Sequence, residues 1–190
     1  RDELIEKFSL KRVQKSGARF DEKRLLWLNG AHIRNISVDK LYEYVSPRED
    51  NPQEDGKQTG FWPESAYAPN ITKEYRMKVL ALAQDRLKMF EDLRGFDYFF
   101  ADPEIDTELI DGNKQLRKLT DDERRDLLTI VHREFEKITD WTPETIQNYL
   151  NQLLETTGQK PGILFSLVRI VTTWAPFSPQ LNDTLALIGK

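Results

Sequence analysis

The stretch LFSLVRIVTTWAPFSPQLNDTLALIGK, residues 164–190, decides the fold class that we expect for this chain. It begins with an apolar run that is typical of a buried helix, passes through a turn rich in Trp, Pro and Phe, and ends in a second helical segment. Ser178 is predicted to be the N-cap of the last helix, with Pro179 at its first position, and Gly189 is predicted to end it. The stretch therefore predicts two closing helices joined by an aromatic turn.

Helical spacing continues upstream of this stretch. A helix is predicted over 72–93, where apolar side chains recur every three or four residues. Thr120 and Glu123 form a capping box for a further helix, and Thr142 is the predicted N-cap of the next one, which Gly158 ends. No segment shows the alternating pattern of a strand. We therefore predict an all-α fold, a helical bundle.

Glycine and polar residues mark breaks near the start of the chain. Asn29-Gly30 predicts a helix break, and Ser37 is predicted to cap a short helix over 38–45. These signals divide the first part of the chain into short helical pieces.

Two polar stretches are predicted to be connections. The stretch 46–69 holds four of the nine prolines and reads as a long loop that Phe61 and Trp62 pin to the body. The aromatic residues of 96–100 are predicted to anchor the core. The acidic stretch 102–113 follows and is our candidate boundary between subdomains.

The composition describes a well-solvated globule without an enzymatic signature. The 190 residues are 38% hydrophobic and 32% charged, with no run long enough to span a bilayer. There is no cysteine, and the two histidines are too far apart in sequence to suggest a metal site. No phosphate-binding glycine motif, nucleophile elbow or zinc-protease motif is present. We predict no catalytic residue and no metal ligand in this chain.

The charge is unevenly distributed. The net charge is −4 and the pI is about 5.4, which argues against a general nucleic-acid binder. The segment 11–24 is nevertheless basic, through Lys11, Arg12, Lys15, Arg19, Lys23 and Arg24. Such segregation permits phosphate contacts on one face, although a solvated charged surface would show the same pattern.

Four groups of residues, in the right order, resemble segments of bacterial-type glutamyl-tRNA synthetases. FSLKRV at 8–13 and FDEKRLLWLNG at 20–30 are similar to the family's F-x-[LW]-x-R-V … F-D-x-x-K-L-x-W-x-N segment. DYFF at 97–100 is similar to its aromatic Y-[FL]-F. The spacing before the terminal helices matches at Trp141, Lys160 and Gly162. The closing stretch resembles LR-apolar-x-x-T-G followed by [ST]-P-x-L…L-x-L-x-G-K, through Arg169, Thr173, Ser178, Pro179, Leu181, Leu185, Leu187, Gly189 and Lys190.

This resemblance implies a division of the chain and a function. Residues 1–45 would be the end of a stem-contact region, 46–112 a first helical anticodon-binding subdomain, and 113–190 a second one. Enzymes of this family attach glutamate to tRNA-Glu with ATP and Mg²⁺, but their H-[IV]-G-H and K-[LM]-S-K signatures are absent here. The resemblance therefore implies a tRNA-Glu-binding fragment of a cytoplasmic ligase. We expect it to be monomeric, with no cofactor of its own and no contact with membrane or DNA.

The resemblance also implies which residues touch the tRNA. An arginine on the family's long middle helix reads the third anticodon base and is associated with rejecting tRNA-Gln, and the alignment places it at Arg86. Arg86 lies on the line of the apolar stripe, four residues after Leu82 and four before Phe90, where an arginine must snorkel or meet a specific partner. The basic residues of 11–24 would contact phosphates of the stem, which position the RNA without specifying its sequence.

The turn before the last helix contacts the first two anticodon bases in relatives. By position this implies Phe177, Ser178, Pro179 and Leu181, although Ser178 also suits a helix cap. The family's glycine after Thr173 is replaced by Trp174, which alters the expected turn. Trp174 would stack on a base or anchor the core.

A function of another class stays open at this point. The acidic pI and the absence of catalytic residues would also suit a helical scaffold that binds proteins and no RNA. A standalone enzyme is not supported, because the sequence offers no catalytic site.

Overall fold

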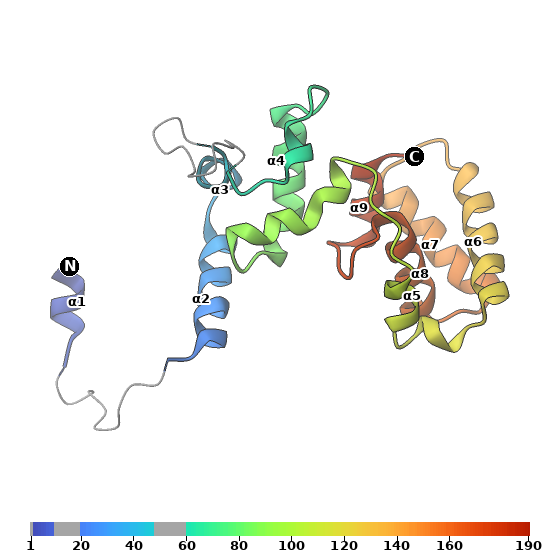
Figure 1. Ribbon diagram of the computed structural model, residues 1–190, viewed down its shortest axis with the longest axis horizontal. Helices are drawn as coiled ribbons and strands as arrows, with labels where there is room; N and C mark the ends of the chain where they lie inside the picture. The colour runs from blue at the N-terminus through green and yellow to red at the C-terminus, as the bar shows by residue number, and fades with distance from the viewer. Residues whose placement is uncertain (1, 10–19, 48–59) are drawn as a thin grey trace.

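The computed structural model describes residues 2–9, 20–47 and 60–190 of the chain. All of the regular structure in these residues is helical, and Figure 1 shows two helical bodies side by side along the longest axis. The all-α prediction is confirmed. In the part of the chain that the structure describes, no helix is long and apolar enough to cross a membrane.

The helices follow one another in a simple order. The α-helices are α1 (Asp2–Lys7), α2 (Glu22–Asn35), α3 (Val38–Val45), α4 (Lys73–Ala83), α5 (Glu108–Gly112), α6 (Asp121–Glu136), α7 (Pro143–Thr157), α8 (Pro161–Thr173) and α9 (Leu181–Ile188). Short 3₁₀ segments lie between them: η2 (Glu64–Tyr67), η3 (Gln84–Arg86), η4 (Phe90–Phe99), which kinks at Phe96, and η5 (Leu116–Lys118).

An aromatic core holds the first body together. Trp62 and Phe96 are among its largest buried side chains, and α2, α3 and α4 contribute aliphatic residues around them. The ring of Trp62 meets Phe100 edge-on, with 5.8 Å between the ring centroids, and Phe61 packs on Phe90 at 5.3 Å. The predicted anchoring by Phe61 and Trp62 and the predicted core role of the 96–100 aromatics are therefore confirmed.

The second body is an aliphatic bundle of α6, α7, α8 and α9. Ile146 and Leu150 of α7 meet Leu164 of α8 in one buried cluster, which Leu185 of α9 completes. A neighbouring cluster centred on Leu116 joins η5 to α6 and α8. These residues lie at helical spacing in the sequence, so each helix turns its apolar stripe toward the others.

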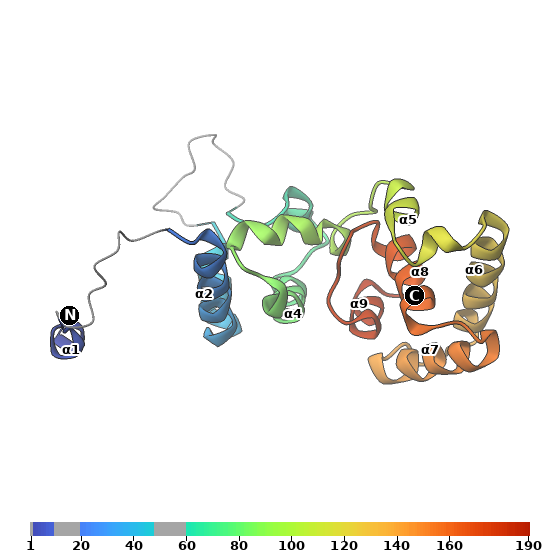
Figure 2. The same cartoon turned by 90° about the horizontal axis from the view of Figure 1, so that it is seen from below.

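The two bodies are joined by α9 and the turn before it. Ala175 of the turn is buried in the core of the first body, and Leu187 of α9 packs against the same core. The hydroxyl of Tyr75 on α4 donates to the carbonyl of Phe99 at 2.9 Å and to that of Leu187 at 3.3 Å. Figure 2 shows α9 beside α4 from below, so the end of the chain contacts both bodies.

Most predicted helix starts and stops are confirmed. The backbone N–H of Thr120 donates to the Glu123 carboxylate at 2.7 Å, and the Thr120 hydroxyl accepts from the Glu123 N–H at 3.3 Å, which completes the capping box. Thr142 caps α7, and Ser37 caps α3. Gly158 ends α7 in the left-handed conformation.

The predicted start of the last helix is wrong. α9 begins at Leu181 with Gln180 at the N-cap, so neither Ser178 nor Pro179 holds the place expected of it. The cause is a tertiary contact, because the Ser178 hydroxyl accepts from Arg169 Nε at 2.8 Å and is buried in the turn. The prediction that Gly189 ends the helix is confirmed.

The predicted helix over 72–93 is not continuous. The α-helix ends at Ala83, and after η3 the chain is extended at Leu87, whose side chain is fully buried. The Asp92 carboxylate then accepts from the backbone N–H groups of Lys88 and Met89, which starts η4. Burial of Leu87 and the Asp92 cap together override the apolar periodicity.

The predicted break at Asn29-Gly30 is also wrong, because α2 runs through both residues. Gly30 is buried against the 87–88 segment, so its missing side chain serves close packing and does not interrupt the helix.

The division into 1–45, 46–112 and 113–190 stays a prediction. Ile33, Leu41 and Val45 share a core with residues after 60. The acidic stretch 102–113 contains α5, which packs against η5 and α8.

Candidate functional site

Two segments that are about 90 residues apart in sequence meet where the two bodies join. The first is 84–96, which spans η3 and the start of η4, and the second is the turn 174–180. We call this place the junction. Arg86 belongs to the first segment, and Arg169 lies on α8 just before the second. The two arginines are close enough for their charges to repel.

Arg169 is the half-buried cation of the junction. Its Nε donates to the Ser178 hydroxyl, which in turn donates to the Pro179 carbonyl at 3.1 Å. Burial lowers the pKa of Arg169 below the ordinary 12.5 and the charge of Arg86 lowers it further, while Tyr98 acts in the opposite direction. An arginine keeps its charge near neutral pH under these influences, so Arg169 braces the turn as a cation.

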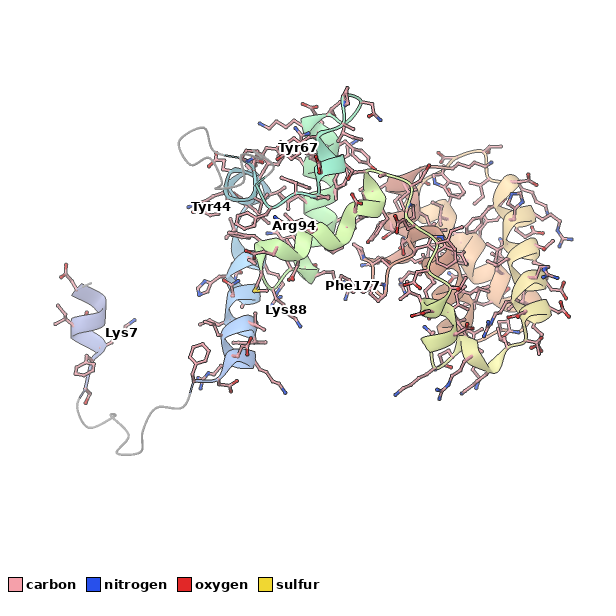
Figure 3. The ribbon with its side chains drawn as sticks, in the orientation of Figure 1. Lys7, Tyr44, Tyr67, Lys88, Arg94 and Phe177 are labelled. Carbon is pink, nitrogen blue, oxygen red and sulfur yellow. The ribbon has the colours of Figure 1, made fainter. Side chains whose placement is uncertain are left out.

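Phe177 offers an aromatic surface beside these cations. Its side chain is 48% exposed, although it is held edge-on against Phe96 with 5.9 Å between the ring centroids. A Cβ on Gly95 would lie 3.6 Å from the tip of the Phe177 ring, so the ring sits over that glycine. Figure 3 shows Phe177 on the turn that faces η4. A ring fixed on one edge and exposed on the other suits stacking on a flat ligand.

Trp174 sets the direction of the turn. It ends α8 in the left-handed conformation, at φ 41° and ψ 39°, and its N–H donates to the Ile170 carbonyl at 2.7 Å. Among the described residues it is the non-glycine residue with positive φ, a conformation that ordinarily favours glycine. Its half-buried side chain packs against the Leu116 cluster. The chain therefore makes a glycine-type reversal with a tryptophan anchored in the core.

The other predicted turn residues lie inside the protein. Leu181 is 6% exposed in the core of the second body, and Ser178 and Pro179 are buried. Contacts of these three residues and of Trp174 with bases stay predictions. Of the residues predicted to touch the anticodon, Arg86 and Phe177 present exposed side chains at the junction.

Three further cations lie near the junction. Arg34 is in the last turn of α2, Lys88 lies between η3 and η4, and Arg94 is in η4. Arg34 Nη1 lies 3.2 Å from the point that a Cβ on Gly30 would occupy, and the Lys88 Cα lies 3.5 Å from the same point. Figure 3 shows Lys88 and Arg94 on the segment that runs from α2 toward Phe177. All three side chains are exposed.

These cations have no acidic partner in the part of the chain that the structure describes, and the same holds for Arg86 and Arg169. Sequence reasoning missed Arg34, Lys88 and Arg94, because no local pattern links Arg34 to residues 88 and 94, more than 50 positions later. A row of basic residues along one helix is visible in a sequence, whereas a cluster assembled from α2 and the 88–94 segment is visible only in the fold.

The predicted phosphate contacts are only partly described. Lys23 and Arg24 lie exposed in the first turn of α2. Lys11, Arg12, Lys15 and Arg19 lie outside the described residues.

A family comparison matches most of the chain. The model of the family described as "Anticodon binding domain" matches residues 40–190. The match includes both segments of the junction and begins after α2.

Similar proteins match the whole chain. A glutamate–tRNA ligase of Chloroflexus aurantiacus is 30% identical over 191 residues, and one of Chlorobium chlorochromatii is 31% identical over 190 residues. These alignments cover 100% and 99% of this chain, and the chain spans 36% of the length of each relative. The crystal structure of a glutamate tRNA ligase from Elizabethkingia meningosepticum has a TM-score of 0.64 at 20% identity, covering 99% of this chain and 34% of that one. That likeness shows the same fold.

Proposed function

Because this chain belongs to the anticodon-binding domain family, we propose that it is the tRNA-reading part of a glutamate–tRNA ligase. In this proposal its ligand is tRNA-Glu, and the junction is where the anticodon bases bind. Since the chain spans 36% of its relatives' length, the attachment of glutamate, the use of ATP, the monomeric state and the cytoplasmic location belong to the proposal for the whole protein. A helical scaffold without RNA binding is not favoured by the family match.

The observation that supports this function most is that two arginines without a described acidic partner lie beside an exposed aromatic ring. Arg86 and Arg169 offer only hydrogen-bond donors, which suit the carbonyl oxygens and ring nitrogens on the edge of an unpaired base. Phe177 offers a flat surface on which such a base can stack. Hydrogen-bond donors and a stacking surface together suit the recognition of unpaired bases in single-stranded loops.

The exposed cations around the junction suit the RNA backbone. Arg34 of α2, Arg94 of η4 and Lys88, which lies between η3 and η4, have no described acidic partner, so they are available to phosphates. Phosphate contacts place the anticodon loop over the junction, and base contacts then discriminate. An overall acidic protein can hold RNA in this way, because local positive charge decides the contact.

The proposal is tested by measuring binding of the chain to tRNA-Glu and to a variant altered at the third anticodon base, by filter retention at several salt concentrations. We expect weak binding of tRNA-Glu that decreases as salt rises, and weaker binding of the variant. Equal affinity for the two tRNAs would remove the assignment of Arg86. A blank gel shift with total tRNA would remove RNA binding altogether and leave the scaffold as the function.

A further inference from the structure

The side chain of Gln84 connects two elements that meet next to Arg86. Its Nε2 donates to the carbonyl of Ile33 at 2.8 Å and to that of Ile36 at 2.7 Å. These carbonyls belong to the end of α2, where a helix leaves acceptors incompletely satisfied; the Ile33 carbonyl accepts also from the Ile36 N–H at 3.3 Å. Gln84 also starts η3, which ends at Arg86. One amide therefore ties the end of α2 to the turn that presents Arg86.

The residues after Arg86 rest directly on the α2 backbone. A Cβ added to Gly30 would lie 3.2 Å from the Leu87 carbonyl oxygen, which is tighter than an ordinary contact. It would lie 3.5 Å from the Lys88 Cα. Asn29 Nδ2 donates to the Lys88 carbonyl, and Leu87 is fully buried. Only a glycine at position 30 lets this segment approach α2 without a shift of a few tenths of an ångström.

Arg86 is thus held from both sides while its own side chain stays exposed. Gln84 fixes the backbone before it, and Leu87 and Lys88 fix the backbone after it. Arg86 itself has no described partner that would set its position. Its distance from Arg169 and Phe177 across the junction therefore depends on α2, although α2 precedes the residues matched by the family model.

We propose that Gln84 and Gly30 are positioning residues that set the discrimination between third anticodon bases by fixing the Arg86 turn on α2. This inference rests on the proposed function of the junction. Base edges are distinguished by donors whose positions are held to about half an ångström, so a small shift of the Arg86 backbone affects discrimination more than overall affinity.

The first test replaces Gln84 with leucine, which keeps the size and removes the donors. Affinities for tRNA-Glu and for the tRNA altered at the third base are measured, and their ratio is the readout. We expect Gln84→Leu to reduce this ratio about fivefold, because two hydrogen bonds that hold the turn are lost. The matched control is Gln147→Leu on α7, another half-buried glutamine whose amide bonds only to Asn151, and it should leave the ratio unchanged.

Gly30→Ala is the independent second variant, and it also serves if Gln84→Leu does not fold. The added methyl group pushes the Leu87 segment away from α2 and should reduce the same ratio. A role confined to stability would instead lower the melting temperature and weaken both tRNAs by the same factor. That outcome would overturn the inference.

A combined variant separates positioning from other effects. In the Arg86→Gln background, Gln84→Leu should cause no further loss of discrimination, because the residue through which it acts is gone. A second, additive loss would contradict the positioning role.

If the unmodified chain does not distinguish the two tRNAs, the proposed function fails. If it does and Gln84→Leu preserves the ratio, this inference alone fails.

Discussion

The cations of α6 and those around the junction have the same side chains but opposite surroundings. On α6, Arg124 bonds to Asp111 and Asp121, each at 3.0 Å, and Arg125 bonds to Asp122 at 3.3 Å. Around the junction, no described carboxylate lies within 4.0 Å of Arg86, Arg94 or Arg169. Arg124 and Arg125 are thus paired with carboxylates of α5 and α6, whereas we propose that the positive charge at the junction serves RNA.

The difference shows why the net charge describes this protein poorly. Arg124 is also a structural residue, since its Nε and Nη2 donate to the Leu116 carbonyl at 3.2 and 3.1 Å. Such an arginine has its donors committed to the fold. At the junction, Arg169 commits its Nε to Ser178, whereas the Arg86 side chain has no described hydrogen-bond partner, and we propose that its donors serve RNA. The difference between the two regions can be tested by making the same kind of substitution at the junction and on α6.

The largest effect is expected from Arg86→Gln, because it removes the donor assigned to the third base. We expect the difference in binding free energy between tRNA-Glu and the third-base variant to shrink by roughly 1–3 kcal/mol. Filter binding measures both affinities. The matched control is Arg125→Gln on α6, which removes an exposed, paired arginine and should leave the difference intact. An equal effect from both substitutions would remove the distinction between the regions.

Phe177→Ala tests the aromatic surface. Loss of the stacking surface should weaken tRNA-Glu binding by roughly 1–3 kcal/mol, because the exposed ring is where a base would stack. Ile105→Ala, which removes another exposed apolar side chain, is the control and should not change the affinity. Unchanged tRNA binding by Phe177→Ala would mean that the ring serves only the packing against Phe96.

The Lys88→Ala/Arg94→Ala double variant tests the phosphate contacts. The slope of log affinity against log salt should fall by about one for each lost side chain, while the ratio between tRNAs stays nearly constant. The Arg125→Ala/Arg133→Ala variant on α6 should leave the slope as it was, since both arginines already face acidic partners. Identical slopes for all three proteins would contradict an RNA path over the junction.

The smallest effect concerns the buried hydroxyl of Tyr98. This hydroxyl has no hydrogen-bond partner among the described residues, and burial raises the Tyr98 pKa above its ordinary 10.0. The folded protein thus keeps this proton more tightly than the unfolded chain, so its contribution to stability is complete below pH 10 and is lost as pH rises above it. Tyr98→Phe should flatten this alkaline loss and raise the unfolding free energy near neutral pH by about 1 kcal/mol, because an unpaired polar group is removed. Urea unfolding at pH 7 and above pH 10 measures the unfolding free energy and its alkaline loss. A Tyr98→Phe variant that is less stable than the unmodified protein at pH 7 would contradict this prediction.

Local signals were sufficient where neighbours in sequence supply the contact. The box of Thr120 and Glu123 and the reversal at Gly158 involve residues within one turn of each other, so their patterns predicted the helix ends correctly. The predictions for Ser178, for Gly30 and for the helix over 72–93 were wrong for a shared reason. In each case the deciding contact lies beyond one helical turn: Ser178 is bound by Arg169, nine residues before it, and the 84–88 segment is held by α2, 51 residues away at the Gln84–Ile33 contact.

The candidate site divides in the same way. Arg86 and Phe177 could be named from the sequence through the resemblance to the synthetase family, and the place of Arg86 in an apolar stripe agreed with it. Arg34, Lys88 and Arg94 could not be found, since nothing in the sequence brings the end of α2 beside η4. Their contribution stays a prediction for the salt experiment to measure.

The sequence by itself determined that this chain is all-α and where most of its helices begin and end, because caps, glycines and apolar spacing act within a few residues. Only the tertiary structure decided what the closing stretch does. It buries Ser178 and Leu181, leaves Phe177 exposed and places Arg169 close to Arg86. The physical reason is that burial and charge at the junction are set by the packing of two bodies, and no single segment contains that information.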